Sequence, residues 1–302
     1  MDFAFNEVSL DDIFYMGKPY NNGKEDIKDR HMIDGERVYP IENTVEIQSH
    51  EFAVRTTILQ DKSIQLEEHC VHTDVEYCFY SILYSNTVLK YPSPIYRYRK
   101  GIEGQTVSDE GRKKRPDDPK RVLLKIMREG KKRLDSFDFS KKKTLIYGTY
   151  DSLYNLYTGN IFNICEYSEK EKMEKYVEFY DDIKEIDQEY ALRVDKKNPE
   201  FGLYYRIKHL PHNIKYIVWG TGAYGKRFVP LIKELYGSNI LVTDANPSKW
   251  GEDFFGETII SPEKALSKRE EDSVFVVAMK DGTEVKNQLI DWGVEEDRIY
   301  CL

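Results

Sequence analysis

The chain has 302 residues, of which 40% are hydrophobic and 32% charged, so it is long enough for two globular domains. Its net charge of −8 and pI near 5.5 argue against a nucleic-acid partner, whose binding protein should carry a basic surface. The sequence contains neither an apolar run of the roughly 18 residues that span a membrane nor a signal peptide at its start. Because its four cysteines are also scattered, we expect a cytoplasmic protein.

The first recognisable pattern covers residues 49–108. Ser49–Thr56 is followed by the polar segment Glu68–Tyr77, an apolar helical run to Leu83 and a short strand pattern at Thr87–Tyr91. Pro94–Ser108 then contains Tyr96-Arg97-Tyr98-Arg99 and ends in Gly101-Ile102-Glu103-Gly104-Gln105-Thr106-Val107-Ser108. Over roughly 40–130 this order resembles the second, acceptor-side half of family 2 glycosyltransferases with the GT-A fold.

This resemblance implies specific roles for residues of the N-terminal part. Asp74 falls where the family places the base that deprotonates the acceptor hydroxyl, although Asp74 or Thr73 could instead be a helix N-cap. Arg97, Arg99 and Gln105 correspond to contacts with the acceptor or the donor phosphates. The family's donor half, with its metal-binding Asp-x-Asp, has no counterpart here, so we expect no divalent metal and no autonomous sugar transfer from this chain alone.

Two further features of residues 69–143 allow a structural or a functional interpretation. His69, Cys70, His72 and Cys78 lie within ten residues, whereas zinc sites take paired ligands from separate segments, so no metal site is predicted. Basic residues from Arg112 to Lys143 alternate with apolar residues at helical spacing. This stretch fits a helix packed on the core with a solvated face, and less well a helix at an anionic membrane surface.

Residues 138–212 form a predicted helical connecting region. Ser168 and Glu171 have the spacing of a capping box, and the helix that follows should bury Met173, Val177, Tyr180 and Ile183. We therefore expect three domains: 1–137, 138–212 and 213–302.

The most informative motif lies at the start of the last domain. The apolar run Tyr216–Trp219 leads into Gly220-Thr221-Gly222-Ala223-Tyr224-Gly225-Lys226, an amphipathic helix pattern, and a second apolar run that ends in Asp244. This is the order of a nucleotide-binding βαβ unit. Gly220 would allow the tight turn, Gly222 the approach of phosphate and Gly225 close packing, while Asp244 would accept hydrogen bonds from ribose hydroxyls.

The remainder of the chain alternates strand and helix patterns. Apolar runs at Thr258–Ile260, Val274–Ala278 and Ile299–Leu302 are separated by helix signals after Ser261 and Asp281. We therefore predict an α/β protein whose C-terminal domain is half of a Rossmann fold with a parallel sheet.

The string Val218–Lys226, together with Asp244–Gly251 and Ile259–Glu263, is similar to small Rossmann-like modules attached to bacterial sugar-modifying proteins. The resemblances together imply a glycosyltransferase-related protein of surface-polysaccharide biosynthesis that lacks its donor half. Its C-terminal module would bind a nucleotide or nucleotide-sugar, its partner would be a separate glycosyltransferase subunit, and it would work in the cytoplasm or peripherally at the inner membrane face.

Two alternatives stay open. One is an NAD(P)-dependent nucleotide-sugar oxidoreductase or epimerase, against which counts the absence of a Tyr-x-x-x-Lys pair after Asp244. The other is a non-catalytic interaction protein whose Rossmann-like module binds nothing.

Overall fold

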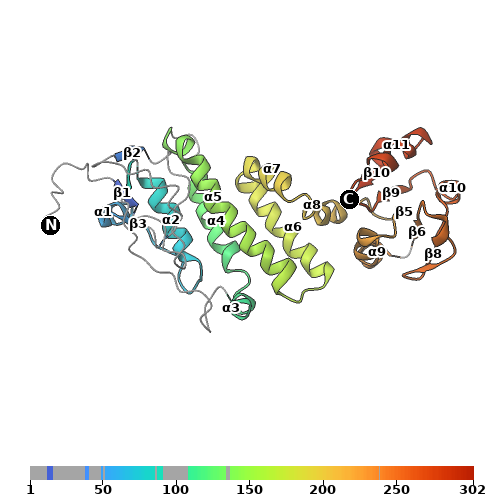
Figure 1. Ribbon diagram of the computed structural model, residues 1–302, viewed down its shortest axis with the longest axis horizontal. Coiled ribbons are helices and arrows are strands. Elements are labelled where there is room, and N and C mark those ends of the chain that lie inside the picture. The colour runs from blue at the N-terminus through green and yellow to red at the C-terminus, as the bar shows by residue number, and fades with distance from the viewer. Residues whose placement is uncertain are drawn as a thin grey trace, which may run out of the picture. The chain divides into compact units, whose positions relative to one another are not determined.

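The computed structural model describes residues 12–15, 38–40, 49, 52–85, 87–90, 108–133, 137–237 and 239–302. The chain divides into two compact units (Figure 1). The N-terminal unit consists of Met1–Glu166 and Phe179–Arg193, and the C-terminal unit of Tyr167–Glu178 and Val194–Leu302. The predicted boundaries at 137 and 212 stay a prediction.

The N-terminal unit contains a mixed sheet with the strand order β2-β4-β1-β3. β1 pairs in parallel with β4 and antiparallel with β3, and β2 pairs antiparallel with β4. The strands are β1 (Asp12–Tyr15), β2 (Val38–Pro40), β3 (Phe52–Val54) and β4 (Thr87–Lys90). The helices of this part are α1 (Thr56–Asp61), α2 (Thr73–Tyr84), α3 (Asp109–Lys114), α4 (Asp118–Lys131) and α5 (Phe137–Gly159), which continues into the π-helical turn η3 (Asn160–Ile164).

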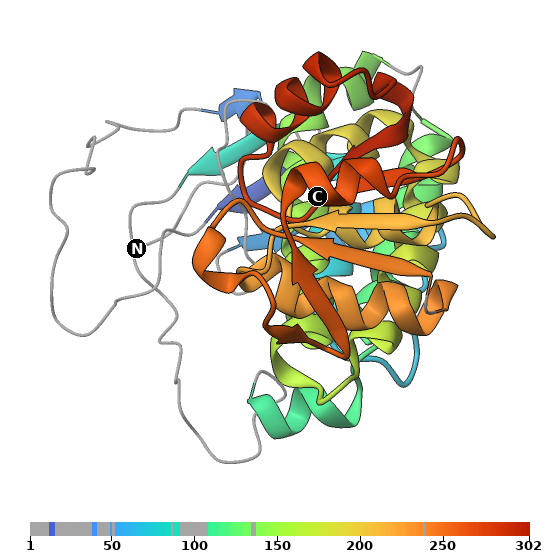
Figure 2. The ribbon, with the colours of Figure 1, turned by 90° about the vertical axis from the view of Figure 1, so that its right-hand side faces the viewer.

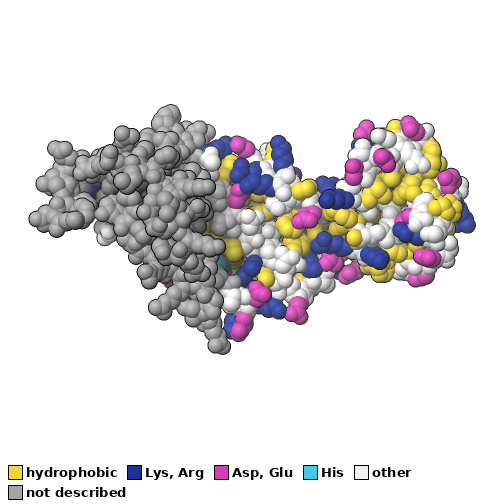
Figure 3. Space-filling view, viewed as in Figure 1, with side chains coloured by type: hydrophobic (Ala, Val, Ile, Leu, Met, Phe, Trp, Pro, Cys, Tyr) yellow, Lys and Arg dark blue, Asp and Glu magenta, His cyan; other side chains and the backbone are white. Residues whose placement is uncertain are grey.

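Helix α4 shows how the basic stretch folds. Val122, Leu123, Ile126 and Met127 are at most 1% exposed, so one face of the helix belongs to the core. Arg121, whose side chain is 47% exposed, forms an ion pair with Glu67 on the other face. This is the core-packed arrangement with a solvated face that the spacing favoured. On the face drawn in Figure 3, Lys and Arg are interspersed with Asp and Glu.

Aromatic side chains fill the helical part of the N-terminal unit. Tyr147, Tyr150, Tyr154 and Tyr157 of α5 are buried, and Tyr157 meets Phe179 edge-on at 4.5 Å between ring centroids. Further helices are α6 (Glu169–Ile186), α7 (Gln188–Lys197) and α8 (Gly202–Lys208). No helix among the described residues is long and apolar enough to cross a membrane.

The start of α6 confirms the predicted capping box. The Glu171 N–H donates to Ser168 Oγ at 3.2 Å, and the Ser168 N–H donates to a carboxylate oxygen of Glu171 at 2.8 Å. Met173 and Ile183 of the predicted apolar side are fully buried.

The C-terminal unit contains a sheet with the order β10-β9-β5-β6-β8-β7, whose strands are orange to red in Figure 2. All pairings are parallel except that of β7 with β8. The strands are β5 (Tyr216–Trp219), β6 (Ile240–Thr243), β7 (Asp253–Phe254), β8 (Glu257–Ile260), β9 (Val274–Val277) and β10 (Ile299–Cys301). The helices are α9 (Ala223–Tyr236), α10 (Pro262–Ser267) and α11 (Thr283–Asp291), with 3₁₀ turns η4 (Pro247–Lys249) and η5 (Glu296–Arg298). The predicted α/β class and Rossmann-like parallel sheet are confirmed.

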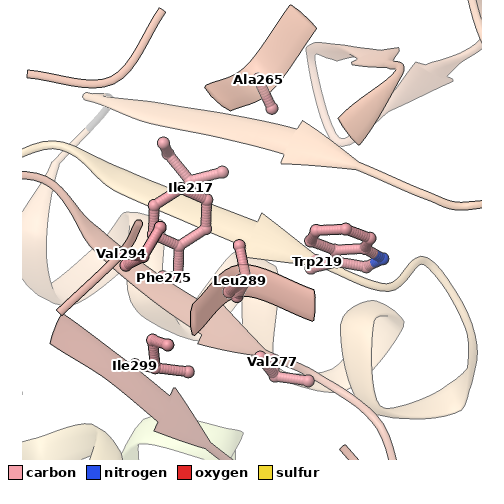
Figure 4. Close-up of a cluster of buried hydrophobic side chains, with 8 residues drawn as sticks. All are labelled: Ile217, Trp219, Ala265, Phe275, Val277, Leu289, Val294 and Ile299. Atoms are coloured by element: carbon pink, nitrogen blue, oxygen red, sulfur yellow. The ribbon is translucent and has the colours of Figure 1, made fainter. Parts of the chain in front are cut away.

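Helices cover both faces of this sheet. On one face, Ile217, Trp219, Phe275 and Val277 pack with Leu289 of α11 and Ala265 of α10, in the cluster shown in Figure 4. On the other face, Tyr216 lies 5.2 Å from Tyr236 of α9, measured between ring centroids. Burial on both sides explains why the central strands are continuous apolar runs rather than alternating ones.

Helix α9 also contacts helices that precede the sheet. Arg227 Nε donates to Glu169 Oε2 at 2.9 Å, and Tyr204 of α8 packs edge-on against Phe228 at 5.5 Å between centroids. The Tyr236 hydroxyl donates to the Ile207 carbonyl at 2.6 Å. The Rossmann-like sheet thus shares one compact unit with α8 and the start of α6.

Candidate functional site

The glycine turn after β5 is shaped by two close backbone approaches. Gly220 has φ +116°, which L side chains rarely adopt, and a Cβ there would lie 2.8 Å from the Ala278 carbonyl oxygen. A Cβ on Gly225 would lie 2.1 Å from the Gly220 carbonyl oxygen. Both positions therefore require glycine for the turn itself, whatever the turn binds.

Gly222 differs from these two glycines because no such contact surrounds it. A Cβ there would meet nothing within 4 Å, and both Gly222 and Ala223 are exposed. Gly222 is the N-cap of α9, and this N-terminus has no side-chain cap. There is therefore open space beside Gly222 at the helix end whose unpaired N–H groups and dipole attract an anion.

Asp244 follows β6 and connects the glycine turn to the next loop. Its Oδ2 accepts hydrogen bonds from the Thr221 N–H at 3.0 Å, from the Thr221 hydroxyl and from Lys249 Nζ at 2.8 Å. Its Oδ1 accepts from the Asn246 N–H at 2.9 Å. Asp244 is only 8% exposed, so its carboxylate is a buried link between the ends of β5 and β6.

The electrostatics of Asp244 follow from these four donors. Burial by itself would raise the pKa of the carboxyl group, but the hydrogen bonds from Lys249, Thr221 and Asn246 outweigh it and lower the pKa to about 2. Asp244 is therefore charged at neutral pH. The predicted ribose contact stays a prediction, and Oδ1 is the oxygen with the spare acceptor position, since it accepts from Asn246 whereas Oδ2 accepts from three donors.

Two residues of the site were not singled out from the sequence. Lys249 Nζ contacts both Asp244 Oδ2 and Thr221 Oγ1, and Trp250 Nε1 donates to the Asp244 carbonyl at 2.8 Å. The 3₁₀ turn η4 brings them back to Asp244. The only available signal was the Asn246-Pro247 pair, which marks a turn at this point.

The strand order places a topological switch beside the glycine turn. β6 and β8 lie on one side of β5, whereas β9 and β10 lie on the other. The Ala278 N–H donates to the Trp219 carbonyl at 2.8 Å, so the loop after β9 adjoins the turn. Open α/β sheets bind ligands at such a switch in strand order, in the crevice outside the carboxyl ends of the strands.

The indole of Trp219 lies in the core below the turn. Trp219 is 1% exposed, and its indole nitrogen has no hydrogen-bond partner among the described residues.

The other predicted residues lie in or near the N-terminal unit. Asp74 is exposed in the first turn of α2. The interpretation of Asp74 or Thr73 as the cap is wrong, because the N-cap is His72, at φ +68°, and the His72 side chain makes no capping hydrogen bond with the described residues. Arg97, Arg99 and Gln105 lie outside the described residues.

Buried charge near Asp74 is paired. Glu76 is fully buried, and its carboxylate lies 2.7 Å from Lys125 Nζ and accepts from the Glu67 N–H at 2.8 Å. Burial lowers the pKa of His72, and the negative charges of Asp74 and Asp118, which raise it, only partly offset this effect. No group of three or more His, Cys, Asp or Glu side chains among the described residues could hold a metal ion.

Comparison with known proteins gives few matches. A family model described as C2185-like, N-terminal, matches residues 212–300. No curated protein matches the chain. The family 2 glycosyltransferase resemblance stays a prediction.

Two similar solved structures are both of RSP. One, titled as RSP in complex with beta-NADH, has 12% identity and a TM-score of 0.25, over 46% of this chain and 87% of that chain. The other, titled as RSP, a Rex-family repressor, has 13% identity and a TM-score of 0.24, over 61% of this chain and 85% of that chain. TM-scores this low do not establish a shared arrangement.

Proposed function

We propose that the C-terminal unit binds the diphosphate of a nucleotide or nucleotide-sugar at the turn Gly220–Gly225. The observation that carries this proposal is the N-terminus of α9 at Gly222, which has no side-chain cap and where a Cβ would meet nothing within 4 Å among the described residues. Backbone N–H groups and the helix dipole at such an end stabilise phosphate oxygens. The strand switch beside the turn supports the same position.

The ribose of this ligand would be held by the free capacity of Asp244. Each oxygen of a carboxylate has about two acceptor positions, and Oδ1 uses one of its two for Asn246. A ribose hydroxyl that donates to Oδ1 would complete the site without displacing Thr221 or Lys249. Both a nucleotide-sugar and NAD(P) have such a ribose, so the chemistry of the site fits either.

A thermal-shift panel on the full chain tests this function. The ligands are NAD(H), NADP(H), UDP-, GDP-, CDP- and dTDP-sugars and inorganic diphosphate. A ligand at 100 times its dissociation constant should stabilise the unit by about 2.7 kcal/mol. The Gly222→Ala variant should lose this response, because its methyl group fills the phosphate approach while touching nothing in the protein.

Gly148→Ala is the matched control, since its Cβ also meets nothing within 4 Å and it lies in α5 of the other unit. This variant should respond to ligands like the wild type. A panel without any stabilising ligand, or an unchanged response in Gly222→Ala, would refute the proposed site. A response to NAD(P) alone would favour the oxidoreductase or epimerase alternative.

The N-terminal unit is a candidate acceptor half of a family 2 glycosyltransferase in surface-polysaccharide assembly. The supporting observation is the exposed carboxylate of Asp74 in the first turn of α2, where an acceptor hydroxyl could reach it. In this arrangement the C-terminal unit recruits the nucleotide-sugar and a separate subunit supplies the donor half. The test is nucleotide release from a sugar nucleotide when this chain is combined with the separate subunit that supplies the donor half. Release that disappears in Asp74→Asn would support this role, and the same release with wild type and variant would refute it.

A further inference from the structure

Trp250 is a large aromatic residue that is not buried in the hydrophobic core. It is 40% exposed, whereas Trp219 is 1% exposed in the core cluster of the same unit. An aromatic ring left in water at the edge of a sheet is available to stack on a flat ligand. Single exposed apolar residues are common, so the argument depends on how this ring is held and where it lies.

The ring is fixed at both its side chain and its backbone. Trp250 Nε1 donates to the Asp244 carbonyl at 2.8 Å, and the Trp250 N–H donates to the Pro247 carbonyl at 3.2 Å. The next residue, Gly251, has φ +88° and donates its N–H to the Ile259 carbonyl of β8 at 2.9 Å. A ring held in this way loses little conformational entropy when a ligand stacks on it.

Its position relates directly to the glycine turn. Trp219 is the register partner of Thr243, so Asp244 stands beside Gly220 at the carboxyl edge of the sheet. Asp244 bonds the Thr221 N–H with its carboxylate and Trp250 with its carbonyl. Asp244 therefore links the Trp250 indole directly to the glycine turn, which leads to the N-terminus of α9.

We propose that the partly exposed ring of Trp250 stacks on the heterocyclic base of the nucleotide whose diphosphate lies at the N-terminus of α9. This inference rests on the proposed function and adds the subsite that distinguishes a nucleotide from a bare diphosphate. Stacking on an aromatic face tolerates any base, because every base presents a π-surface. Trp250 thus supplies affinity for the nucleoside part, and its fixed position sets the direction in which the bound nucleoside extends from the phosphate site.

Calorimetric titration of the full chain with UDP, CDP, GDP, dTDP, ADP and inorganic diphosphate separates the base from the phosphate. In Trp250→Ala, the affinity for the preferred nucleoside diphosphate should fall about 5- to 150-fold, the range for loss of one base–aromatic stack. The affinity for inorganic diphosphate should stay unchanged. Trp250→Phe, which keeps a stacking face, should recover most of the loss.

Phe255→Ala is the control, because Phe255 is a 47% exposed aromatic residue of the same unit that follows β7 instead of β6. It should bind nucleotides like the wild type. Tryptophan fluorescence gives a second readout: the change on adding nucleotide should vanish in Trp250→Phe, although Trp219 and Trp292 remain.

The outcomes distinguish base stacking on Trp250 from the proposed diphosphate binding at the glycine turn. Wild-type affinity for nucleotides in Trp250→Ala, with diphosphate binding intact, would overturn the stacking inference alone. Equal losses of nucleotide and inorganic diphosphate would also overturn it, since Trp250 would then only support the turn. A wild-type chain that binds none of the probes would overturn both proposals.

Discussion

Replacing Asp244 with Asn tests whether the carboxylate stabilises the glycine turn. Asn keeps the size of the side chain, but its amide nitrogen carries hydrogens and cannot accept from the donors that Asp244 now serves. The change removes the charge opposite Lys249 and at least one of the bonds to Thr221 or Asn246. We expect the C-terminal unit to lose stability at neutral pH.

The size of the loss follows from the pKa of Asp244. The folded protein lowers this pKa from 3.8 to about 2, and each unit corresponds to about 1.4 kcal/mol. The charged form is therefore favoured in the folded state by about 2 to 3 kcal/mol. Because the folded pKa is the lower one, this stability is present above pH 4 and is lost as the pH falls through about 2. At pH 3, about half of it should remain.

Urea unfolding followed by tryptophan fluorescence measures this loss in the correct unit, since Trp219, Trp250 and Trp292 are the three tryptophans of the chain. Asp244→Asn should be less stable than the wild type by about 2 to 3 kcal/mol at pH 7 and by about half as much at pH 3. Asp272→Asn, at an exposed acid of the same unit, is the control and should change little. Equal stability of wild type and Asp244→Asn at pH 7, or a difference that does not shrink toward pH 3, would refute the reasoning.

Two more substitutions probe the turn and the helices around it. Gly225→Ala should destabilise the C-terminal unit by about 3 kcal/mol in urea unfolding, because its methyl group would lie 2.1 Å from the Gly220 carbonyl oxygen. Gly222→Ala should cost about 1 kcal/mol or less. Similar losses of stability in both variants would contradict the packing described for the turn. Glu169→Gln should cost about 1 to 2 kcal/mol at pH 7 in the same assay. Burial raises the pKa of Glu169, but hydrogen bonds from Arg227, Lys172 and Tyr204 lower it to about 2. The expected loss of stability is smaller than this pKa shift alone would give, because the side chain is 33% exposed and solvent screens its charge. The Glu169→Gln difference should shrink as the pH falls below about 4, and a pH-independent difference would show that the charge contributes nothing.

The elements predicted most accurately are those with strong local signals. The strand at Tyr216–Trp219 and the helix after it follow from an apolar run, a glycine turn and helical spacing, all within about 20 residues. The capping box of Ser168 and Glu171 is equally local. The contact between Glu169 and Arg227 joins residues 58 positions apart. Local periodicity contains no information about such a pair, so the attachment of α8 and the start of α6 to α9 could not be predicted.

In the candidate site, too, the features with local sequence signals could be predicted and the long-range contacts could not. Spacing placed Asp244 at the end of the second strand, but its partners depend on how the following loop folds back. Lys249 reaches Asp244 and Thr221 only because η4 turns the chain at Pro247. The sequence therefore indicated an acid beside the turn, and it could not show that most of its hydrogen-bonding capacity is used within the protein.

This division changes which residues support a ligand. Gly220, Gly225 and Asp244 complete the glycine-rich motif, yet each also has a structural reason to be the residue that it is: a positive φ, a close backbone contact and a buried set of donors. A Rossmann-like unit that binds nothing would need them equally. Gly222 has no such contact, since a Cβ there would meet nothing within 4 Å. Trp250 bonds the Asp244 carbonyl through Nε1, but this bond does not account for a ring that is 40% exposed. The case for nucleotide binding therefore depends on these two residues, and variants of Gly222 and Trp250 discriminate between a binding module and a purely structural one.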